Sequence, residues 1–433
     1  MIITTIGTGY VGLVTAVGLA DFGNEVIGVD IDKEKIEKLK RGIPPIYEPG
    51  IEEYLRRNLK SGRLSFTSDI ESAIKEADVV FIAVGTPSKD DGDVDLSQVE
   101  NAVKTIAKNL NKYKIIVTKS TVPVGTNRWI YNTIREISGT DNFDVVSNPE
   151  FLREGKAVYD FFHPDKVVIG YESERVKEVL IDIYRPLYLI ETPFVFCNWE
   201  TAELIKYANN AFLATKITFI NQMANLAEEV GADIHVIAKA MGMDGRISPK
   251  FLHPGPGFGG SCFPKDTKAL VKIGEKHGVD MSLIKEVIRA NENQKLRMVM
   301  KLKRNVGDLK GKVITVLGLA FKAETDDMRE SPAITIINKL LEEGAKVKAH
   351  DPKAIENARK IFGDKVEYYD DEYEAAENSD AVMIVTEWNE YRNLNLQRLK
   401  EVMRGNVIVD CRNVLVPEKT RKLGLVYEGV GRL

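Results

Sequence analysis

The sequence predicts an α/β protein in which two doubly wound domains are joined by a long central helix. Three observations lead to this fold class. Residues 2–30 read as strand, glycine turn, helix and strand, and a second alternation of strands and helices begins near residue 312. Between them, residues 198–230 contain neither Gly nor Pro, which predicts one uninterrupted helix. We therefore expect three parts, at residues 1–197, 198–305 and 306–433.

Composition narrows the class of protein. The 433 residues are 44% hydrophobic and 29% charged, with a net charge of −4, as is typical of a soluble globular chain. No basic block indicates a nucleic-acid partner or an anionic membrane. The three cysteines lie far apart and the five histidines are scattered, so we expect no metal site and no disulfide framework, and a cytoplasmic location. Residues 1–20 lack charge, but they contain no basic n-region and glycines at fixed spacing interrupt the apolar run, so we expect no signal or membrane segment there.

The N-terminus carries the clearest motif. A short apolar strand at Ile2–Ile6 is followed by G-T-G-Y-V-G, with glycines at Gly7, Gly9 and Gly12, and then by an apolar helix. The next strand ends in Asp30, close to the spacing of a dinucleotide-binding Rossmann unit. The pyrophosphate would bind at the helix N-terminus. Asp30 would accept hydrogen bonds from ribose hydroxyls and repel a 2′-phosphate, which favours NAD over NADP.

Three further strands end in polar motifs. They are expected at Val79–Val84, Ile115–Thr118 and Val145–Ser147. Ligands of an open parallel sheet bind beyond the carboxyl ends of its strands. The residues placed there are Thr86, Thr121, Glu150 and Glu154. A turn or helix-capping role is the alternative for each of them.

The central helix is apolar on nearly all sides, so we expect it to be buried and to form an oligomer core. Lys206 and Asn210 lie four residues apart on one of its faces. A buried lysine there would act as an acid or stabilise an oxyanion. The alternative is that Lys206 extends to the surface. Gly231 is the expected end of the helix.

One cysteine stands in an unusual setting. Four glycines within residues 255–260 precede Cys262, and Pro264, Lys265 and Asp266 follow it. Glycines permit positive φ and close backbone approach, while proline suits the first turn of a helix. A cysteine on a loop entering a helix N-terminus is favoured as thiolate. We therefore predict a reactive Cys262, with Asp266 as a base or water-positioning group, rather than a small buried apolar residue.

The C-terminal part repeats the Rossmann pattern with a degenerate glycine motif, so it would bind a different nucleotide or none. Strands are expected at Lys312–Leu317, Lys346–His350, Ala381–Thr386 and Asn406–Asp410. Lys322 and Arg329 follow the first of these strands, where a phosphate would lie, and Arg412 follows the last.

Six specific motifs are spread along the chain: G-T-G-Y-V-G, K-S-T-V-P-V-G, N-P-E-F-L-R-E-G, A-E-L-I-K-Y-A-N-N-A-F, G-F-G-G-S-C-F-P-K-D and F-K-A-E-T-D-D-M-R-E-S. In these the sequence resembles the UDP-glucose 6-dehydrogenase family of nucleotide-sugar dehydrogenases. The resemblance implies oxidation of the sugar C6 alcohol to a carboxylate with two NAD and no release of the aldehyde. It also implies two Rossmann-like domains, a homodimer or higher homo-oligomer built on the long helix, a UDP-sugar substrate and a place in polysaccharide biosynthesis.

The resemblance also implies residue roles. Cys262 would capture the aldehyde, Asp266 and Thr121 would handle water and proton, Lys206 and Asn210 would stabilise an oxyanion, and Glu150 would assist thioester hydrolysis. The implied NAD-binding residues are Gly7, Gly9, Tyr10, Val11, Gly12, Asp30, Lys35, Thr86, Thr121, Glu154, Lys265 and Arg329. The implied substrate-binding residues are Glu150, Phe151, Leu152, Lys206, Asn210, Arg246, Phe251, His253, Gly257, Phe321, Lys322 and Arg412, with Arg246 reaching across a dimer interface.

Several alternatives remain open at the level of sequence. G-G-S-C-F-P-K-D resembles members that act on UDP-glucose, but the same chemistry on a UDP-N-acetylhexosamine or on GDP-mannose is the alternative. A two-electron dehydrogenase of the 6-phosphogluconate kind would share the N-terminal half but explains neither Cys262 nor the C-terminal half. A non-catalytic NAD-binding sensor with a redox-active thiol is the rival from another functional class.

Overall fold

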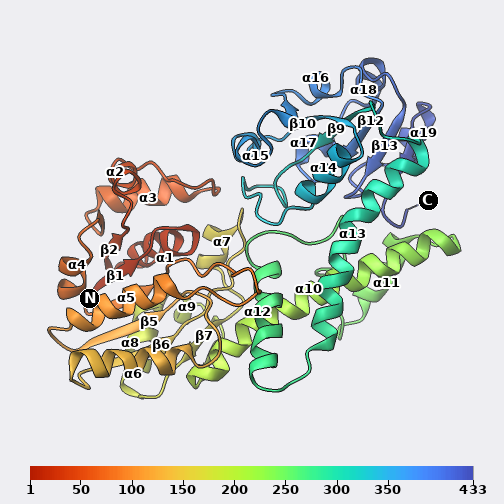
Figure 1. Ribbon diagram of the computed structural model, residues 1–433. Coiled ribbons are helices and arrows are strands. Elements are labelled where there is room, and N and C mark those ends of the chain that lie inside the picture. The colour runs from red at the N-terminus through yellow and green to blue at the C-terminus, as the bar shows by residue number, and fades with distance from the viewer. Residues whose placement is uncertain (433) are drawn as a thin grey trace. The chain divides into compact units, whose positions relative to one another are not determined.

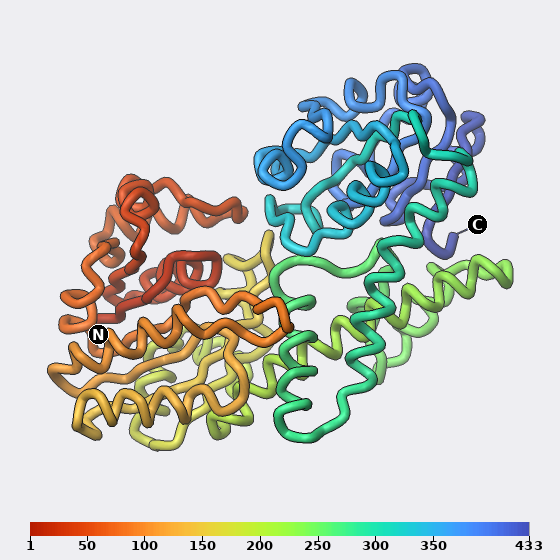
Figure 2. The backbone as a smooth tube through the Cα atoms, in the orientation of Figure 1, coloured from red at the N-terminus to blue at the C-terminus, as the bar shows by residue number. Residues whose placement is uncertain are grey.

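The computed structural model describes residues 1–432 and divides into two compact units. Unit 1 comprises residues 1–209 and 272–277, and unit 2 comprises the rest of the described chain. Figure 2 traces the backbone from the N-terminus in red to the C-terminus in blue. Residue 433, the end of the predicted C-terminal domain, lies outside the described residues.

Unit 1 is built on an eight-stranded sheet with the order β3-β2-β1-β4-β5-β6-β7-β8. Its strands are β1 (Ile2–Ile6), β2 (Glu25–Val29), β3 (Leu64–Thr67), β4 (Val79–Ile82), β5 (Lys114–Thr118), β6 (Phe143–Ser147), β7 (Val167–Gly170) and β8 (Phe194–Cys197). The first six strands are parallel and follow the order of a Rossmann fold. β7 runs antiparallel to β6 and pairs in parallel with β8, which differs from the fully parallel sheet that we expected.

Helices cover both faces of this sheet because its central strands are apolar on both sides. Val79 and Phe81 of β4 face one hydrophobic core, whereas Val80 and Ile82 face the other. The helices are α1 (Tyr10–Asp21), α2 (Lys33–Lys40), α3 (Ile51–Lys60), α4 (Ile70–Glu76), α5 (Ser97–Lys108), α6 (Thr126–Ser138), α7 (Ala157–Phe162), α8 (Arg175–Ile183) and α9 (Arg185–Leu189). The predicted doubly wound arrangement is thus confirmed for this half of the chain.

The middle of the chain is helical. Figure 1 shows α10 (Trp199–Val230) as one uninterrupted helix, as predicted, and Gly231 ends it with φ at 72°. It is followed by α11 (Ile234–Met243), α12 (Phe263–Lys276) and α13 (Ser282–Val306). None of the helices within residues 1–432 is both long and apolar enough to cross a membrane.

Unit 2 contains a six-stranded, wholly parallel sheet with the order β11-β10-β9-β12-β13-β14. Its strands are β9 (Val313–Leu317), β10 (Lys346–His350), β11 (Val366–Tyr368), β12 (Ala381–Ile384), β13 (Val407–Asp410) and β14 (Val426–Glu428). Its helices are α14 (Pro332–Glu342), α15 (Ile355–Phe362), α16 (Glu372–Ala376), α17 (Asn389–Arg392), α18 (Leu396–Val402) and α19 (Pro417–Lys422). This order repeats that of the first six strands of unit 1, which confirms the second Rossmann-like domain.

The degenerate glycine motif of unit 2 keeps its first position. Gly318 follows β9 with φ at 98°, and a Cβ placed there would lie 2.4 Å from the Thr386 side chain. Only glycine fits this turn without displacing Thr386. The tight turn after the first strand is therefore shared by both sheets, although the later glycines are not.

Candidate functional site

The three glycines after β1 have different surroundings. Gly7 has φ at 96°, and a Cβ there would lie 2.6 Å from the Ala83 carbonyl oxygen. A Cβ at Gly12 would lie 2.0 Å from the Gly7 carbonyl oxygen. Both positions therefore need glycine for backbone packing, whereas a Cβ at Gly9 would meet nothing within 4 Å. Open space at the N-terminus of α1, where Tyr10 begins the helix, fits the predicted approach of a pyrophosphate.

Asp30 lies at the end of β2, in a network of donors. Its carboxylate accepts hydrogen bonds from the Thr8 N–H at 3.0 Å, the Thr8 hydroxyl at 2.7 Å and the Asp32 N–H at 3.1 Å. The Lys35 ammonium lies 2.9 Å away. Partial burial would raise the pKa of Asp30, but the bonds from Asp32, Thr8 and Lys35 outweigh it and lower the pKa. The carboxylate is therefore held ionised beside the glycine turn.

The loop after β6 is held by two residues from earlier in the chain. The Gly155 N–H donates to the Tyr10 hydroxyl at 2.8 Å and to the Glu48 carboxylate at 2.7 Å. Glu48 also accepts from the Ala157 N–H at 2.7 Å and is only 4% exposed. Glu154 precedes Gly155, so this buried carboxylate fixes the backbone beside a predicted NAD-binding residue. Glu48 was not predicted, because it belongs to no recognisable sequence motif.

A buried ion pair joins this loop to α10. The Lys206 ammonium lies 2.9 Å from the Glu150 carboxylate and donates to the Glu150 carbonyl oxygen at 2.7 Å. The other carboxylate oxygen of Glu150 accepts from the Leu152 N–H at 2.6 Å. Burial would raise the pKa of Glu150, but Lys206, the Leu152 N–H and Lys119 together lower it. The alternative in which Lys206 extends to the surface is wrong, since its side chain is 4% exposed.

Phe151 and a second buried lysine surround this pair. The Phe151 ring lies 5.3 Å from the Lys206 ammonium and 4.2 Å from that of Lys166. The Lys119 ammonium donates to the Asn148 side-chain oxygen at 3.0 Å. Burial lowers the pKa of Lys119 to about 8, with negative Glu150 opposing the effect and positive Lys206 adding to it. From the sequence, Lys119 was only the first residue of the motif K-S-T-V-P-V-G. Its burial in the structure distinguishes it from an ordinary surface lysine.

The loop after β5 is fixed to α10 by Glu203. This carboxylate, 2% exposed, accepts from the Gly125 N–H at 2.6 Å and from the Asn127 N–H at 2.7 Å. It also accepts from the Asn127 side-chain amide at 2.7 Å. Gly125 precedes α6, so Glu203 supplies the acceptor that the first amides of this helix need. Thr121, a predicted catalytic residue, lies in the same loop, and Glu203 was not predicted.

In unit 2, Cys262 directly precedes α12, as predicted. Its carbonyl oxygen accepts a hydrogen bond from the Asp266 N–H at 2.8 Å, and this bond closes the first turn of the helix. The Asp266 carboxylate accepts from the Asn210 side-chain amide at 2.6 Å and from the Lys265 ammonium at 2.7 Å. Asp266 is 1% exposed, and the Ser261 hydroxyl lies 3.6 Å from the Cys262 sulfur. The structure thus brings Asn210, Lys265 and Asp266 together one helical turn after the cysteine.

The glycines before Cys262 are required by protein contacts. A Cβ at Gly257 would lie 2.8 Å from the Asn291 side-chain oxygen, and one at Gly260 would lie 2.7 Å from the Phe321 ring. The Gly260 N–H donates to the Arg329 carbonyl oxygen at 2.8 Å. Close backbone approach was predicted for a ligand, and the structure shows it toward other segments of unit 2.

The predicted substrate residues of the second sheet gather beside this loop. The Arg412 guanidinium donates to the Phe321 carbonyl oxygen at 2.8 Å and pairs with Glu387 at 3.0 Å. A Cβ at Gly255 would lie 3.3 Å from the same guanidinium. The Lys322 ammonium lies 5.4 Å from the Phe321 ring. Phe321, Lys322 and Arg412 therefore border the glycine loop of Cys262.

The remaining predicted residues differ in exposure and in contacts. Arg246 is 90% exposed and pairs with Asp244 at 2.6 Å, and His253 is exposed. The Arg329 side chain is 63% exposed and pairs with Asp327 at 2.7 Å. Phe251 adopts a positive φ of 65° and its ring lies 6.1 Å from that of Phe263. Two predicted residues of unit 1, Thr86 and Val11, lie beyond β4 and in the first turn of α1.

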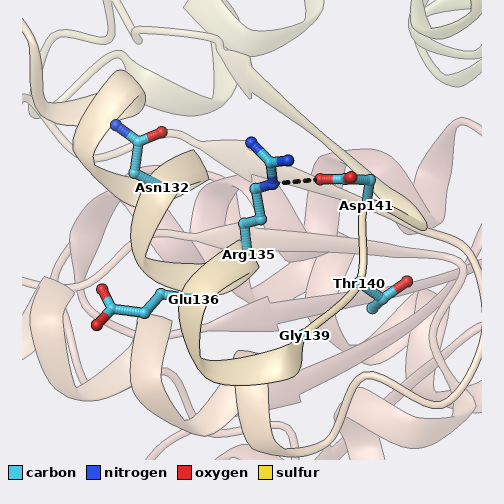
Figure 3. Close-up of a pocket in the computed structure, with 6 residues that line it drawn as sticks. All are labelled: Asn132, Arg135, Glu136, Gly139, Thr140 and Asp141. Carbon is cyan, nitrogen blue, oxygen red and sulfur yellow. Dashed lines mark ion pairs between the residues drawn. The ribbon is translucent and has the colours of Figure 1, made fainter.

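A surface hollow of about 400 Å³ is lined by none of these residues. Figure 3 shows it at the C-terminal end of α6, with the ion pair between Arg135 and Asp141 at 2.8 Å. Gly125 and Glu203 lie at the opposite end of that helix. The hollow therefore adds nothing to the candidate site.

Known protein families and relatives match this chain over nearly all of its length. Three models of the UDP-glucose/GDP-mannose dehydrogenase family match: the NAD binding domain at residues 1–188, the central domain at 200–293 and the UDP binding domain at 315–417. The chain belongs to the UDP-glucose/GDP-mannose dehydrogenase family. It is 50% identical to the UDP-glucose 6-dehydrogenase of Rhizobium meliloti (strain 1021), over 100% of both chains. It is 48% identical to the UDP-glucose 6-dehydrogenase TuaD of Bacillus subtilis (strain 168), over 99% of this chain and 93% of that protein.

A solved structure agrees with these relatives. A UDP-glucose dehydrogenase from the hyperthermophilic archaeon Pyrobaculum islandicum matches with a TM-score of 0.93 and 43% identity, over 100% of this chain and 98% of that one. The cofactor of this family is NAD, and the open Gly9 and ionised Asp30 fit it. Among residues 1–432, no group of three or more His, Cys, Asp or Glu side chains is placed to hold a metal ion.

Replacement of Asp30 by Ala should weaken the preference for NAD over NADP by about 1–3 kcal/mol, since charged hydrogen bonds to the ribose and repulsion of the 2′-phosphate are both lost. Fluorescence titration with NADH and NADPH measures both dissociation constants. Asp32→Ala is the matched control, because Asp32 caps α2 through the Lys35 N–H at 3.0 Å. An unchanged preference in Asp30→Ala would mean that Asp30 does not face the ribose.

Lys119 should make the free energy of unfolding increase as the pH rises above about 8. Its folded pKa of about 8 lies below the ordinary value of 10.5, so between these values the unfolded chain binds more protons at this position. Raising the pH should therefore stabilise the parent relative to Lys119→Met, by on the order of 3 kcal/mol in all. Urea unfolding of both proteins at several pH values measures the difference. Lys104→Met removes an exposed lysine, so its unfolding free energy should change with pH as that of the parent does. If Lys119→Met also changed with pH as the parent does, the lowered pKa of Lys119 would be contradicted.

Proposed function

We propose that this chain is an NAD-dependent UDP-glucose 6-dehydrogenase, which oxidises UDP-glucose to UDP-glucuronate. The observation that carries the proposal is Cys262 at the N-terminus of α12, one turn before the buried group of Asn210, Lys265 and Asp266. Relatives with this name match the chain over nearly its full length. In this assignment residues 1–197 bind NAD, 198–305 carry the cysteine loop and the dimer helix, and 306–433 bind the UDP-sugar.

The reaction removes four electrons from one carbon. The C6 alcohol loses a hydride and a proton to give the aldehyde, to which the Cys262 thiolate adds through a new C–S bond. The former carbonyl oxygen takes up a proton, and the resulting thiohemiacetal loses a second hydride and its hydroxyl proton to become a thioester. Water then attacks the carbonyl carbon, the C–S bond breaks, and the carboxylate and the thiol are released. When bound, NAD supplies the hydride acceptor for each oxidation.

The covalent intermediate explains why a cysteine is present at all. A free aldehyde would hydrate and diffuse away, whereas a hemithioacetal stays bound and gives up its hydride readily. Cys262 at a helix N-terminus has backbone amides and the helix dipole to favour its thiolate. Asp266, fixed by Asn210 and Lys265, would position water or accept its proton.

Residues of α10 and of the loops after β5 and β6 would supply the other roles. Lys206 and Asn210 lie four residues apart on α10 and would stabilise the oxyanion formed at each addition step. Glu150, whose carboxylate is kept ionised by Lys206, would assist hydrolysis of the thioester. Thr121, in the loop that Glu203 fixes, would take part in handling water and proton.

The UDP-sugar would be held by the second sheet. Phe321, Lys322 and Arg412 border the glycine loop and offer an aromatic face and two cations for the base and the phosphates. A UDP-N-acetylhexosamine or GDP-mannose is the alternative substrate. Names of relatives at 43–50% identity favour UDP-glucose.

The test is to incubate the purified protein with NAD and UDP-glucose and count NADH per sugar consumed. We expect two NADH per UDP-glucuronate. Cys262→Ala should abolish formation of the acid while NAD binding persists, and Cys197→Ala, which removes the other partly exposed cysteine, should retain turnover. Normal turnover in Cys262→Ala would contradict the covalent mechanism. One NADH per sugar would indicate a two-electron dehydrogenase, and NAD binding without turnover on any nucleotide sugar would favour the sensor.

We infer further that the protein is a cytoplasmic homodimer formed through α10. Phe212, Phe219 and Leu226 are 65%, 44% and 54% exposed and recur every seven residues, as in a helix-pairing seam. Apolar side chains aligned in this way along one helix face favour association. The exposure of Arg246 fits its predicted reach into a partner's site.

Replacement of Phe219 by Glu should convert the dimer to monomer, because a charge would be buried at the centre of the seam. Light scattering coupled to size-exclusion chromatography measures the mass. Leu283→Glu places the same charge on an exposed apolar position of α13 and should leave the dimer intact. A dimer of unchanged mass in Phe219→Glu would place the interface elsewhere.

A further inference from the structure

The backbone before Cys262 is held by neutral amide side chains. Residues 255–258 run between α10 and α13, and both helices direct buried amides at this backbone. The three residues concerned are Asn221 on α10 and Asn291 and Gln294 on α13, with 2%, 2% and 3% of their surface exposed.

The pairing begins at Gly255. Its N–H donates to the Asn221 side-chain oxygen at 2.8 Å, and its carbonyl oxygen accepts from the Gln294 amide at 2.9 Å. Gln294 is in turn fixed by the Asn225 amide, which donates to its oxygen at 2.9 Å. Both backbone polar groups of Gly255 are therefore satisfied by side chains rather than by secondary structure.

The pairing is repeated at Phe258. Its N–H donates to the Asn291 side-chain oxygen at 2.7 Å, and its carbonyl oxygen accepts from the Asn291 amide at 3.0 Å. A single asparagine thus mimics the two bonds of a neighbouring strand. Gly257 makes this possible, since a Cβ there would lie 2.8 Å from the Asn291 oxygen.

The fixed backbone continues into the helix of the cysteine. The Phe258 ring meets the Phe263 ring edge-on, with centroids 6.0 Å apart. Phe258 is buried with Ala214 of α10 and Val287 of α13, and Phe263 is the first residue of α12. Cys262 lies between these two anchored positions, so a shift of residues 255–258 would move the sulfur.

We propose that Asn221, Asn291 and Gln294 are positioning residues that fix the Cys262 loop for reaction. This inference rests on the proposed function. A displacement of about 1 Å at a reacting group can cost about a hundredfold in rate. Loss of the amide bonds should therefore lower kcat without loss of NAD binding.

The chain offers a matched control on the same helix. Asn221 and Thr218 both line a cavity of about 380 Å³ between α10 and α13. The Thr218 hydroxyl is buried and has no hydrogen-bond partner among residues 1–432. Thr218→Val keeps the shape of the side chain and changes the same cavity wall. It removes no hydrogen bond to the loop.

The first experiment compares steady-state kinetics of Asn221→Leu, Asn291→Leu and Gln294→Met with Thr218→Val. We expect kcat to fall by about tenfold to a hundredfold in the first three, with the KM for NAD unchanged, and to stay at the parent value in the fourth. Asn221→Asp keeps an acceptor for the Gly255 N–H and should recover most of the activity lost in Asn221→Leu. Full activity in the three variants, or equal loss in Thr218→Val, would overturn the proposal.

A second experiment separates this inference from the proposed function. Amide hydrogen exchange followed by mass spectrometry reports on the peptide containing residues 255–258 even if the parent protein proves inactive on every nucleotide sugar. Exchange should accelerate in that peptide in Asn291→Leu and remain unchanged elsewhere and in Thr218→Val. Unchanged exchange in that peptide would overturn the clamping role, whatever the reaction.

Discussion

Burial of polar groups on the largely apolar helix α10 is the constraint on which the loops of the candidate site depend. Glu203, Lys206 and Asn210 recur at helical spacing along α10 and are each less than a tenth exposed. A buried charge or amide without a partner costs several kcal/mol, roughly 3–5 for a broken buried ion pair. Each therefore dictates what packs beside it: the loop after β5 on Glu203, the loop after β6 on Lys206 and the first turn of α12 on Asn210.

The fold could be predicted from sequence where strands are central. β4 and β5 are buried on both faces and read as continuous apolar runs. The strands that escaped prediction, such as β3, β11 and β14, are short edge strands with alternating exposed positions. Their sequences resemble loops because half of each faces solvent, and pairing with a neighbour creates them. The reversal at β7 has no local signal, since it depends on the path of the preceding loop.

The parts of the candidate site that could be predicted are those in which a residue type is unusual for its neighbouring sequence. The glycine turn, Asp30, and Cys262 before a proline all carry local signals. Glu48 does not, because its partners lie far along the chain. Glu48 holds the amides of residues 155 and 157, more than a hundred positions away. Only the folded chain shows that such an ordinary polar residue is buried, and burial is what assigns it a role.

The choice of amides around the cysteine loop follows from the same logic. A backbone unit needs one acceptor and one donor, and a carboxamide supplies both with no net charge. A buried carboxylate in place of Asn291 would lose the donor that the Phe258 carbonyl oxygen needs and would bury a charge without a partner. A lysine would lose the acceptor for the Phe258 N–H. A neutral amide therefore lets α13 fix the Phe258 backbone without burying a charge.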